Sequence, residues 1–132
     1  MTATTPRWIL VVDDEVDIRV MLVRLLGRFG FGVREARDGG EAIQILESCE
    51  GDHPALVLTD LCLPTLTGAA LARYVAKRFP ALPVMLMSGY YADLVSMDEV
   101  STQGWVLLQK PFTTGQLERA LARTFEQRLT RE

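Results

Sequence analysis

The chain has 132 residues, with 14 Lys and Arg against 17 Asp and Glu, a formal net charge of −3 at pH 7. That length predicts one domain with a real hydrophobic core, and the mildly acidic balance argues against nucleic-acid binding by the domain. No apolar stretch could cross a bilayer, residues 1–6 lack signal-peptide features, and Cys49 and Cys62 follow no disulfide or metal spacing, so we expect a cytoplasmic domain without a membrane partner.

Five short segments have the length of β-strands. All but the second are apolar runs of the kind that is buried on both faces of a sheet. Each of these four runs is followed at once by polar or turn-forming residues. The predicted strands are residues 8–12, 32–36, 56–60, 84–87 and 105–108.

A segment with helical periodicity or helix-capping residues follows each strand. Gly30 is placed to end the first helix as a C-terminal cap. Asp38 with Glu41, and Thr113 with Gln116, have the spacing of capping boxes at the starts of the second and fifth helices. The predicted helices are residues 16–29, a segment that opens after Asp38, and residues 68–79, 91–101 and 113 to about 128.

Strand and helix thus alternate five times along the chain. Alternation of this kind predicts an α/β fold, because parallel strands need helical crossovers that pack on both faces of the sheet. The expected architecture is a flavodoxin-like, doubly wound, five-stranded parallel sheet in the order 2-1-3-4-5 with five helices. We expect residues 1–132 to form a single domain, with its core at about 7–128 and no separate output domain.

Polar residues of an unusual kind occur at the ends of four of the five strands. Asp13 and Asp14 follow the first strand, Asp60 ends the third, Ser88 follows the fourth and Lys110 lies just beyond the fifth. In the order 2-1-3-4-5 these four strands are adjacent, while the second strand, which has no such residue, lies at the edge. We therefore expect these side chains to meet at the carboxyl ends of the strands, where open α/β sheets hold their ligands.

Three carboxylates in one place repel each other unless a cation lies among them. Oxygen ligands favour a hard ion, so we expect Mg²⁺, for which Mn²⁺ could substitute. Lys110 offers a point charge and Ser88 a hydroxyl donor for phosphate oxygens, and a carboxylate beside them can attack phosphorus to give an aspartyl phosphate. Because the chain has no Walker loop and no dinucleotide-binding glycine pattern, phosphoryl chemistry at Asp60 is the leading interpretation.

Taken together and in this order, the motifs resemble those of the response regulator receiver domain of bacterial two-component systems, over essentially the whole chain. Each motif lies at a strand end or a helix start, which makes the set specific although each motif alone is weak. The matching pieces are Val11-Val12-Asp13-Asp14-Glu15, Asp38-Gly39-Gly40-Glu41-Ala42, Thr59-Asp60 with Pro64 and Gly68, Met87-Ser88-Gly89, and Gln109-Lys110-Pro111-Phe112.

The resemblance implies a phosphoacceptor signalling switch in a phosphorelay, not a conventional enzyme. It implies that Asp60 receives a phosphoryl group from the phosphohistidine of a sensor histidine kinase or a phosphotransfer domain, and that partner binding then changes. It further implies that Asp14 and Asp60 bind Mg²⁺ through their side chains, Asp13 through water, and Cys62 through its backbone carbonyl.

The resemblance also implies that Ser88 and Lys110 contact the phosphoryl group and that the Lys110–Pro111 peptide is cis. One departure from the family is at the switch. Leu107 occupies a position that is usually Tyr or Phe, an aromatic that normally turns inward when the hydroxyl residue engages phosphate. Trp105 lies two residues earlier on the same strand face and is a candidate substitute.

A second departure is Thr67, which stands where Asp or Asn commonly precedes the glycine. The loop should still form, because Gly68 keeps the conformationally permissive position. Tyr90, Tyr91 and Trp105 fit two interpretations equally well, exposed interface aromatics or partly buried packing residues.

Two alternative functions stay open. Leu107 motivates a phosphorylation-independent docking module that has lost the usual aromatic switch. A phosphohydrolase of the aspartyl-phosphate type would carry Asp-x-Asp at its nucleophile, but Cys62 stands at the second position, so its general acid is missing. The chain also looks similar to receivers fused to the end of hybrid sensor kinases. A homodimer through the fourth helix, the fifth strand and the fifth helix is a further expectation.

Overall fold

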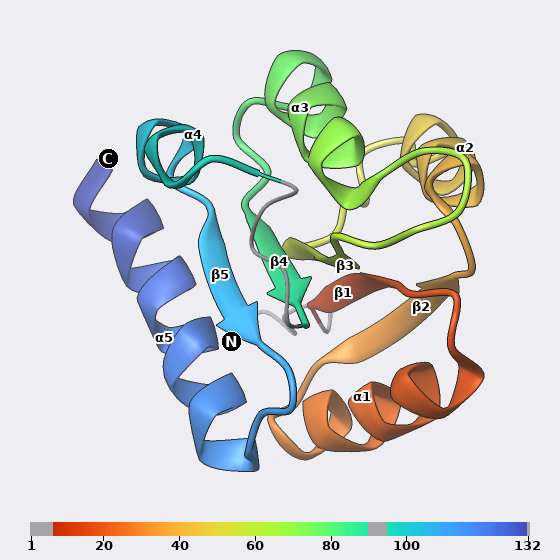
Figure 1. The fold of residues 1–132 in the computed structure, drawn as a ribbon, viewed down its shortest axis with the longest axis vertical. Coiled ribbons are helices and arrows are strands. Elements are labelled where there is room, and N and C mark those ends of the chain that lie inside the picture. The colour runs from red at the N-terminus through yellow and green to blue at the C-terminus, as the bar shows by residue number, and fades with distance from the viewer. Residues whose placement is uncertain (1–6, 90–94, 132) are drawn as a thin grey trace, which may run out of the picture.

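The computed structural model describes residues 7–89 and 95–131 of the chain, in which strands and helices alternate (Figure 1). The strands are β1 Trp8–Val12, β2 Gly32–Ala36, β3 Leu56–Asp60, β4 Val84–Ser88 and β5 Val106–Gln109. The helices are α1 Val16–Arg28, α2 Gly39–Glu47, α3 Gly68–Arg78, α4 Met97–Gln103 and α5 Thr114–Arg131.

The five strands form one sheet in the order β2-β1-β3-β4-β5, and every neighbouring pair is parallel. This arrangement confirms the predicted fold class and strand order. Because all five strands run the same way, their carboxyl ends lie along one edge of the sheet. The order reverses between β1 and β3, which is the point where open α/β sheets form a crevice for a ligand.

Helices cover both faces of the sheet, with α1 and α5 on one side and α2, α3 and α4 on the other (Figure 1). Alternate residues of the central strands enter different cores. Ile9, Leu58 and Met85 pack with α1 and α5, whereas Leu10 and Leu86 pack with the other three helices. Every residue of β1, β3 and β4 is buried, which explains why these strands appear in the sequence as unbroken apolar runs.

The predicted helix caps are present. Gly30 follows α1 with φ +91°, and the N–H of Phe31 donates to the carbonyl of Leu26 at 3.0 Å, as in a Schellman motif. Asp38 caps α2 by accepting from the N–H of Glu41 at 2.8 Å. The Glu41 carboxylate accepts in turn from the N–H of residue 37, one position before the cap, at 2.7 Å.

The start of α5 is a complete capping box. The Thr113 hydroxyl accepts from the N–H of Gln116 at 3.1 Å, and the Gln116 side chain accepts from the N–H of Thr113 at 2.8 Å. Thr67 caps α3 by accepting from the N–H of Ala70 at 3.1 Å. The helices α1 and α3 each end one residue earlier than predicted.

The prediction for the fourth helix was wrong in its bounds. The helix begins at Met97, because the Ser96 hydroxyl accepts from the N–H of Glu99 at 3.0 Å and caps it there. It ends at Gln103, and the C-terminal cap is Gly104, whose φ of 75° is left-handed. The N–H of Trp105 donates to Val100 in this ending, so β5 begins one residue later than predicted. Residues 90–94 lie outside the described part of the chain.

Among the described residues, no helix is both long enough and apolar enough to cross a membrane.

Candidate functional site

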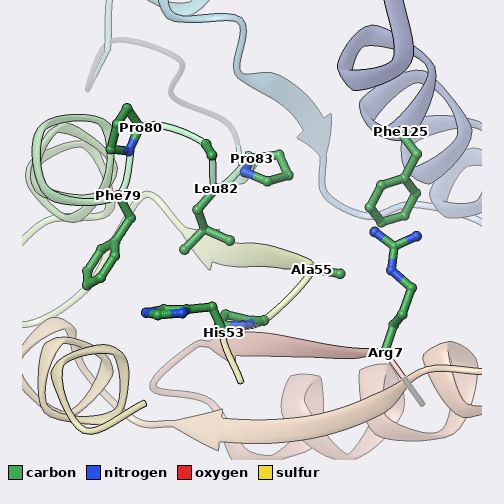
Figure 2. A pocket seen from close by; sticks show the side chains of 10 residues that line it. Arg7, His53, Ala55, Phe79, Pro80, Leu82, Pro83 and Phe125 are labelled. Atoms are coloured by element: carbon green, nitrogen blue, oxygen red, sulfur yellow. The ribbon is translucent and has the colours of Figure 1, made fainter. Parts of the chain in front are cut away.

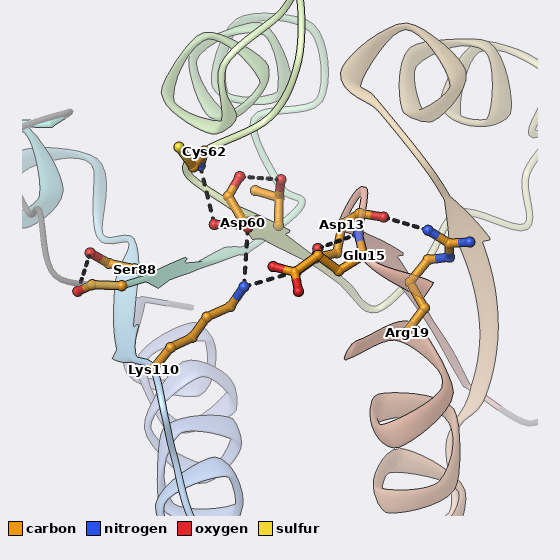
Figure 3. Close-up of polar contacts among 9 residues, drawn as sticks. Asp13, Glu15, Arg19, Asp60, Cys62, Ser88 and Lys110 are labelled. Carbon is orange, nitrogen blue, oxygen red and sulfur yellow. Dashed lines mark hydrogen bonds and ion pairs between the residues drawn. The ribbon is translucent and has the colours of Figure 1, made fainter. Parts of the chain in front are cut away.

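The polar residues predicted from four strands lie at the carboxyl-end edge of the sheet (Figure 3). Asp13 follows β1, Asp60 ends β3, Ser88 ends β4 and Lys110 follows β5. The strand register pairs residue 12 with residue 59 and Asp60 with residue 87, so the strands end nearly level. The topology therefore assembles the site from four segments that are far apart in the sequence.

One ammonium group links two of these carboxylates. Lys110 Nζ donates to Asp13 Oδ2 at 3.0 Å and to Asp60 Oδ2 at 3.1 Å (Figure 3). The side chains are largely buried, with exposed fractions of 17% for Lys110, 0% for Asp13 and 8% for Asp60. Buried charges of this kind are tolerated only when they are paired, so the lysine offsets part of the repulsion between the two carboxylates.

Burial and pairing act on the acid–base properties of the site in opposite ways. Burial raises the pKa of Asp13 above its ordinary value and outweighs the hydrogen bonds from the Glu15 N–H and Lys110, which lower it. Burial lowers the pKa of Lys110, but hydrogen bonds to Asp13 and Asp60 outweigh it and leave that pKa raised. Lys110 is therefore a cation at neutral pH, whereas folding disfavours the ionised form of Asp13.

The other oxygen of each buried carboxylate is also held. The N–H of Glu15 donates to Asp13 Oδ1 at 2.9 Å, and the N–H of Cys62 donates to Asp60 Oδ1 at 3.1 Å. Asp14 is exposed and completes an acidic cluster, in which one oxygen each of Asp13, Asp14 and Asp60 lie within 4.8 Å of one another. Three carboxylate oxygens this close fit a hard divalent cation of the Mg²⁺ type.

Gly68 approaches the backbone of the site. A Cβ atom at this position would lie 2.1 Å from the Asp60 carbonyl oxygen and 2.7 Å from the Leu61 Cα. The Gly68 N–H donates to the Leu61 carbonyl at 3.0 Å, which fixes this contact. The prediction that Gly68 serves a permissive backbone conformation was wrong, because its φ is not positive. Glycine fits there because α3 starts directly against the end of β3.

Arg19 is a site residue that the sequence analysis missed. Its Nη1 donates to the backbone carbonyl of Asp13 at 2.7 Å, and its Nε pairs with Glu35 Oε1 of β2 at 3.0 Å. The guanidinium thus holds the segment that carries Asp13 and Asp14. Its place in the first turn of α1, which begins directly after the acidic run, was the one available signal.

Ser88 and Cys62 lie beside the linked carboxylates. Ser88 is 2% exposed, and its hydroxyl donates to the neighbouring Gly89 carbonyl at 3.4 Å. The backbone N–H of Lys110 donates to the Ser88 carbonyl at 2.6 Å, and the Lys110–Pro111 peptide is cis. The Cys62 thiol is exposed, and its backbone N–H bonds to Asp60. The phosphate contact of Ser88 and the Cys62 carbonyl ligand stay predictions.

The two residues of the predicted switch region pack against the same core, but only Leu107 belongs to β5, because Trp105 lies just before the strand begins. Trp105 is buried at 6% exposure within the core that faces α2, α3 and α4, and Leu107 is half-buried against the same core. Trp105 is therefore a packing residue, and its interpretation as an exposed interface aromatic was wrong. Tyr90 and Tyr91 lie outside the described residues.

Comparison with known proteins places this geometry in a family context. The family model described as the response regulator receiver domain matches residues 9–122. The response regulator protein PilR of Pseudomonas aeruginosa is 34% identical over 113 residues, which cover 86% of this chain and 25% of PilR. The sensor kinase CckA of Brucella abortus is 33% identical over 109 residues, or 83% of this chain and 11% of CckA.

Solved structures agree with the sequence comparison. A response regulator receiver domain protein from Clostridium thermocellum superposes with a TM-score of 0.83 at 27% identity, covering 96% of this chain and 99% of that one. NtrX from Brucella abortus gives a TM-score of 0.81 at 31% identity, covering 96% of this chain and 29% of NtrX. The chain spans only part of the length of such curated relatives, from 11% of CckA to 44% of the probable transcriptional regulator ycf27 of Cyanophora paradoxa.

Proposed function

This chain belongs to the response regulator receiver domain family, and on that premise we propose that it is a phosphoacceptor switch that takes a phosphoryl group on Asp60. The observation that carries the proposal is the placement of Asp60 at the end of β3. There Lys110 Nζ donates hydrogen bonds to the carboxylates of both Asp60 and Asp13. A nucleophilic carboxylate next to a fixed cation and an acidic cluster is what transfer from a phosphohistidine requires.

In the proposed step, a carboxylate oxygen of Asp60 attacks phosphorus and forms an O–P bond. The N–P bond of the phosphohistidine breaks, and the electron pair returns to the imidazole, which takes up a proton. The donor would be a sensor histidine kinase or a phosphotransfer domain. The Cys62 N–H already holds one oxygen of Asp60 at 3.1 Å, so the nucleophile is oriented before the donor arrives.

The acidic cluster would hold Mg²⁺, with Asp14 and Asp60 as direct ligands, Asp13 through water and Cys62 through its carbonyl oxygen. When bound, this ion offsets the negative charge of the phosphoryl oxygens. Mn²⁺ has the same preference for oxygen and could substitute. Asp14 is exposed, so the site can be reached from solvent.

Lys110 and Ser88 would contact the phosphoryl group once it is on Asp60. Lys110 Nζ already bonds the Asp60 carboxylate, so a small rotation brings its charge to a phosphoryl oxygen. The Ser88 hydroxyl bonds only weakly, to Gly89 at 3.4 Å, and can turn to donate to a second oxygen. The new contacts would shift a two-state equilibrium and change the surface formed by α4, β5 and α5, which could also serve a homodimer.

The test is incubation of the chain with acetyl phosphate and Mg²⁺, followed by intact-mass measurement. We expect the mass gain of one phosphoryl group, absent when EDTA is present from the start of the incubation and absent in Asp60→Asn. Equal incorporation in wild type and Asp60→Asn would overturn the proposal, because phosphate would then be elsewhere. Incorporation that does not need a divalent cation would remove the metal part of the proposal.

Leu107 supports a second candidate, a docking module that does not depend on phosphate. The position packs a half-buried aliphatic side chain against the core, where an aromatic switch residue is usual in the family. Beryllofluoride, which mimics the phosphoryl group, separates the two functions. Amide shifts that spread to α4 and β5 support the switch, whereas shifts confined to the rim around Asp60 favour docking without switching.

The relatives include a sensor kinase and a response regulator, each much longer than this chain. Two arrangements are therefore proposed for this receiver: a stand-alone regulator, or one part of a hybrid kinase. Reading the coding sequence on both sides of this segment would separate the two.

A further inference from the structure

A cavity lies at the edge of the sheet opposite Asp60, where the strands begin (Figure 2). The cavity has a volume of about 590 Å³, which is within the range of small-molecule sites. Pro54 and Ala55 lead from it into β3, and Pro83 leads into β4. The cavity thus touches the starts of the two strands that carry Asp60 and Ser88 at their other ends.

The floor of this cavity is apolar and already hydrogen-bonded. Pro54 and Pro83 have no N–H group, and their fixed φ angles stiffen the backbone. The N–H of Ala55 donates to the Trp8 carbonyl at 2.7 Å, and the Pro83 carbonyl accepts from Val57 at 3.0 Å. A preformed floor without spare donors suits an apolar ligand body and costs little to order on binding.

Aromatic side chains form the two walls (Figure 2). On one side, the rings of His53 and Phe79 lie 5.2 Å apart in a tilted arrangement. On the other side, Phe125 stacks on Phe31 at 5.7 Å, which holds the Phe125 ring in place. The guanidinium of Arg7 lies over the Phe125 ring, 4.8 Å from its centroid. Two walls of this kind favour a flat or branched apolar group between them.

The charge of the lining is one-sided. Its ten residues include Arg7 and His53 and no carboxylate. The nearest acid in the sequence, Asp52, accepts a hydrogen bond from the Trp8 indole at 3.4 Å and does not line the cavity. Arg7 is exposed and forms no salt bridge within the described residues, and its guanidinium lies over the face of the Phe125 ring. A ligand with a single negative charge would complete this site.

We propose that this cavity binds a small amphipathic organic anion, with an aromatic or branched aliphatic body and one carboxylate. The body lies on the proline floor between Phe79 and Phe125, and the carboxylate pairs with the planar guanidinium of Arg7. A carboxylate can accept two parallel hydrogen bonds from the planar guanidinium of an arginine. One carboxylate also balances the single positive charge of Arg7.

Binding is measured by NMR titration of the metal-free, unphosphorylated chain with phenylbutyrate and with its neutral analogue, phenylbutanol. We expect saturable shifts at His53, Phe79 and Phe125, and an affinity for phenylbutyrate about fivefold higher than for phenylbutanol. Arg7→Gln should abolish this difference and leave phenylbutanol binding unchanged. Arg24→Gln removes an exposed arginine of α1 outside the cavity and should change neither affinity.

Equal affinity for the acid and the alcohol, in wild type and in Arg7→Gln alike, would overturn the anion part of the proposal. Absence of saturable shifts at His53, Phe79 and Phe125 with both ligands would overturn the site. Shifts at these residues that depend on protein concentration and need no ligand would assign the cavity to a second copy of the chain instead. Because Asp60 chemistry takes no part in the titration, these failures leave the phosphoacceptor proposal untouched.

Discussion

The ammonium of Lys110 lies 3.1 Å from Oδ2 of Asp60, although fifty residues separate the two in the sequence. The contact exists because β5 and β3 flank β4 and all three end at the same edge of the sheet. The same ammonium bonds Asp13, so one cation serves two largely buried carboxylates.

Replacing Lys110 with Met should destabilise the protein at pH 7. The change keeps most of the side-chain volume but leaves two buried carboxylates without their cation, which costs roughly 2–4 kcal/mol of unfolding free energy. Lys77→Met, at the exposed end of α3, is the matched control and should change stability by less than about 0.5 kcal/mol. Urea unfolding measures both, and equal stabilities for the two variants would contradict the assigned role.

Asp13→Asn should change the dependence of stability on pH. Folding raises the pKa of Asp13, so the folded state binds this proton more tightly than the unfolded state. The carboxyl therefore stabilises most below its ordinary pKa, and that contribution is lost as pH rises through the folded value. In metal-free buffer, the stability of Asp13→Asn relative to wild type should therefore rise as the pH increases above the ordinary carboxyl pKa of about 4. Urea unfolding midpoints of Asp13→Asn and wild type, measured at a series of pH values, test this expectation. A difference between the two midpoints that does not change with pH would contradict it.

Gly68→Ala should destabilise the fold by about 3 kcal/mol, because the added Cβ would meet the Asp60 carbonyl oxygen at 2.1 Å and backbone must move. Gly27→Ala offers the matched control. Gly27 lies within α1, where an added Cβ atom would meet nothing within 4 Å, so alanine there should stabilise by roughly 0.5–1 kcal/mol. In thermal or urea unfolding, we expect Gly68→Ala to lower the free energy of unfolding and Gly27→Ala to raise it. A neutral Gly68→Ala would show that α3 can shift away from β3 at no cost.

Asp14→Asn should weaken Mg²⁺ binding about tenfold or more while leaving stability within about 0.5 kcal/mol of wild type. The Asp14 side chain is exposed, so its replacement should change the free energy of unfolding little. It belongs to the acidic cluster, so the replacement should remove one metal ligand. Isothermal titration with MgCl₂ gives the affinity. Asp17→Asn, an exposed acid in the first turn of α1, is the control and should bind like wild type. Unchanged affinity in Asp14→Asn would remove this residue from the metal site.

The strand order and the meeting of Asp60 with Lys110 could be predicted from the sequence, because both follow from where polar residues interrupt apolar runs. Four apolar strands left clear signals, and one topology brings their ends together. The capping boxes at Asp38 and Thr113 were predictable for the same reason, since each depends on two residues at a fixed spacing.

Other features depend on tertiary contacts that no local pattern carries. The start of α4 was predicted too early, because residues before its Ser96 cap also have helical propensity. The role of Gly68 depends on the distance between the start of α3 and the end of β3, and that of Arg19 on the neighbouring strand β2. The cavity beside Arg7 is formed by loops and a helix that are far apart in the sequence, so no sequence motif predicts it.

The central claim is that Asp60 is the phosphoacceptor, and chemical mapping of the phosphorylated residue tests it most directly. After treatment with acetyl phosphate and Mg²⁺, borohydride reduces an aspartyl phosphate to homoserine, which peptide mass spectrometry can locate. We expect homoserine at position 60 alone, and none when Mg²⁺ is withheld. Homoserine at position 13 or 14, or at no position in a sample that has gained phosphate, would contradict the account.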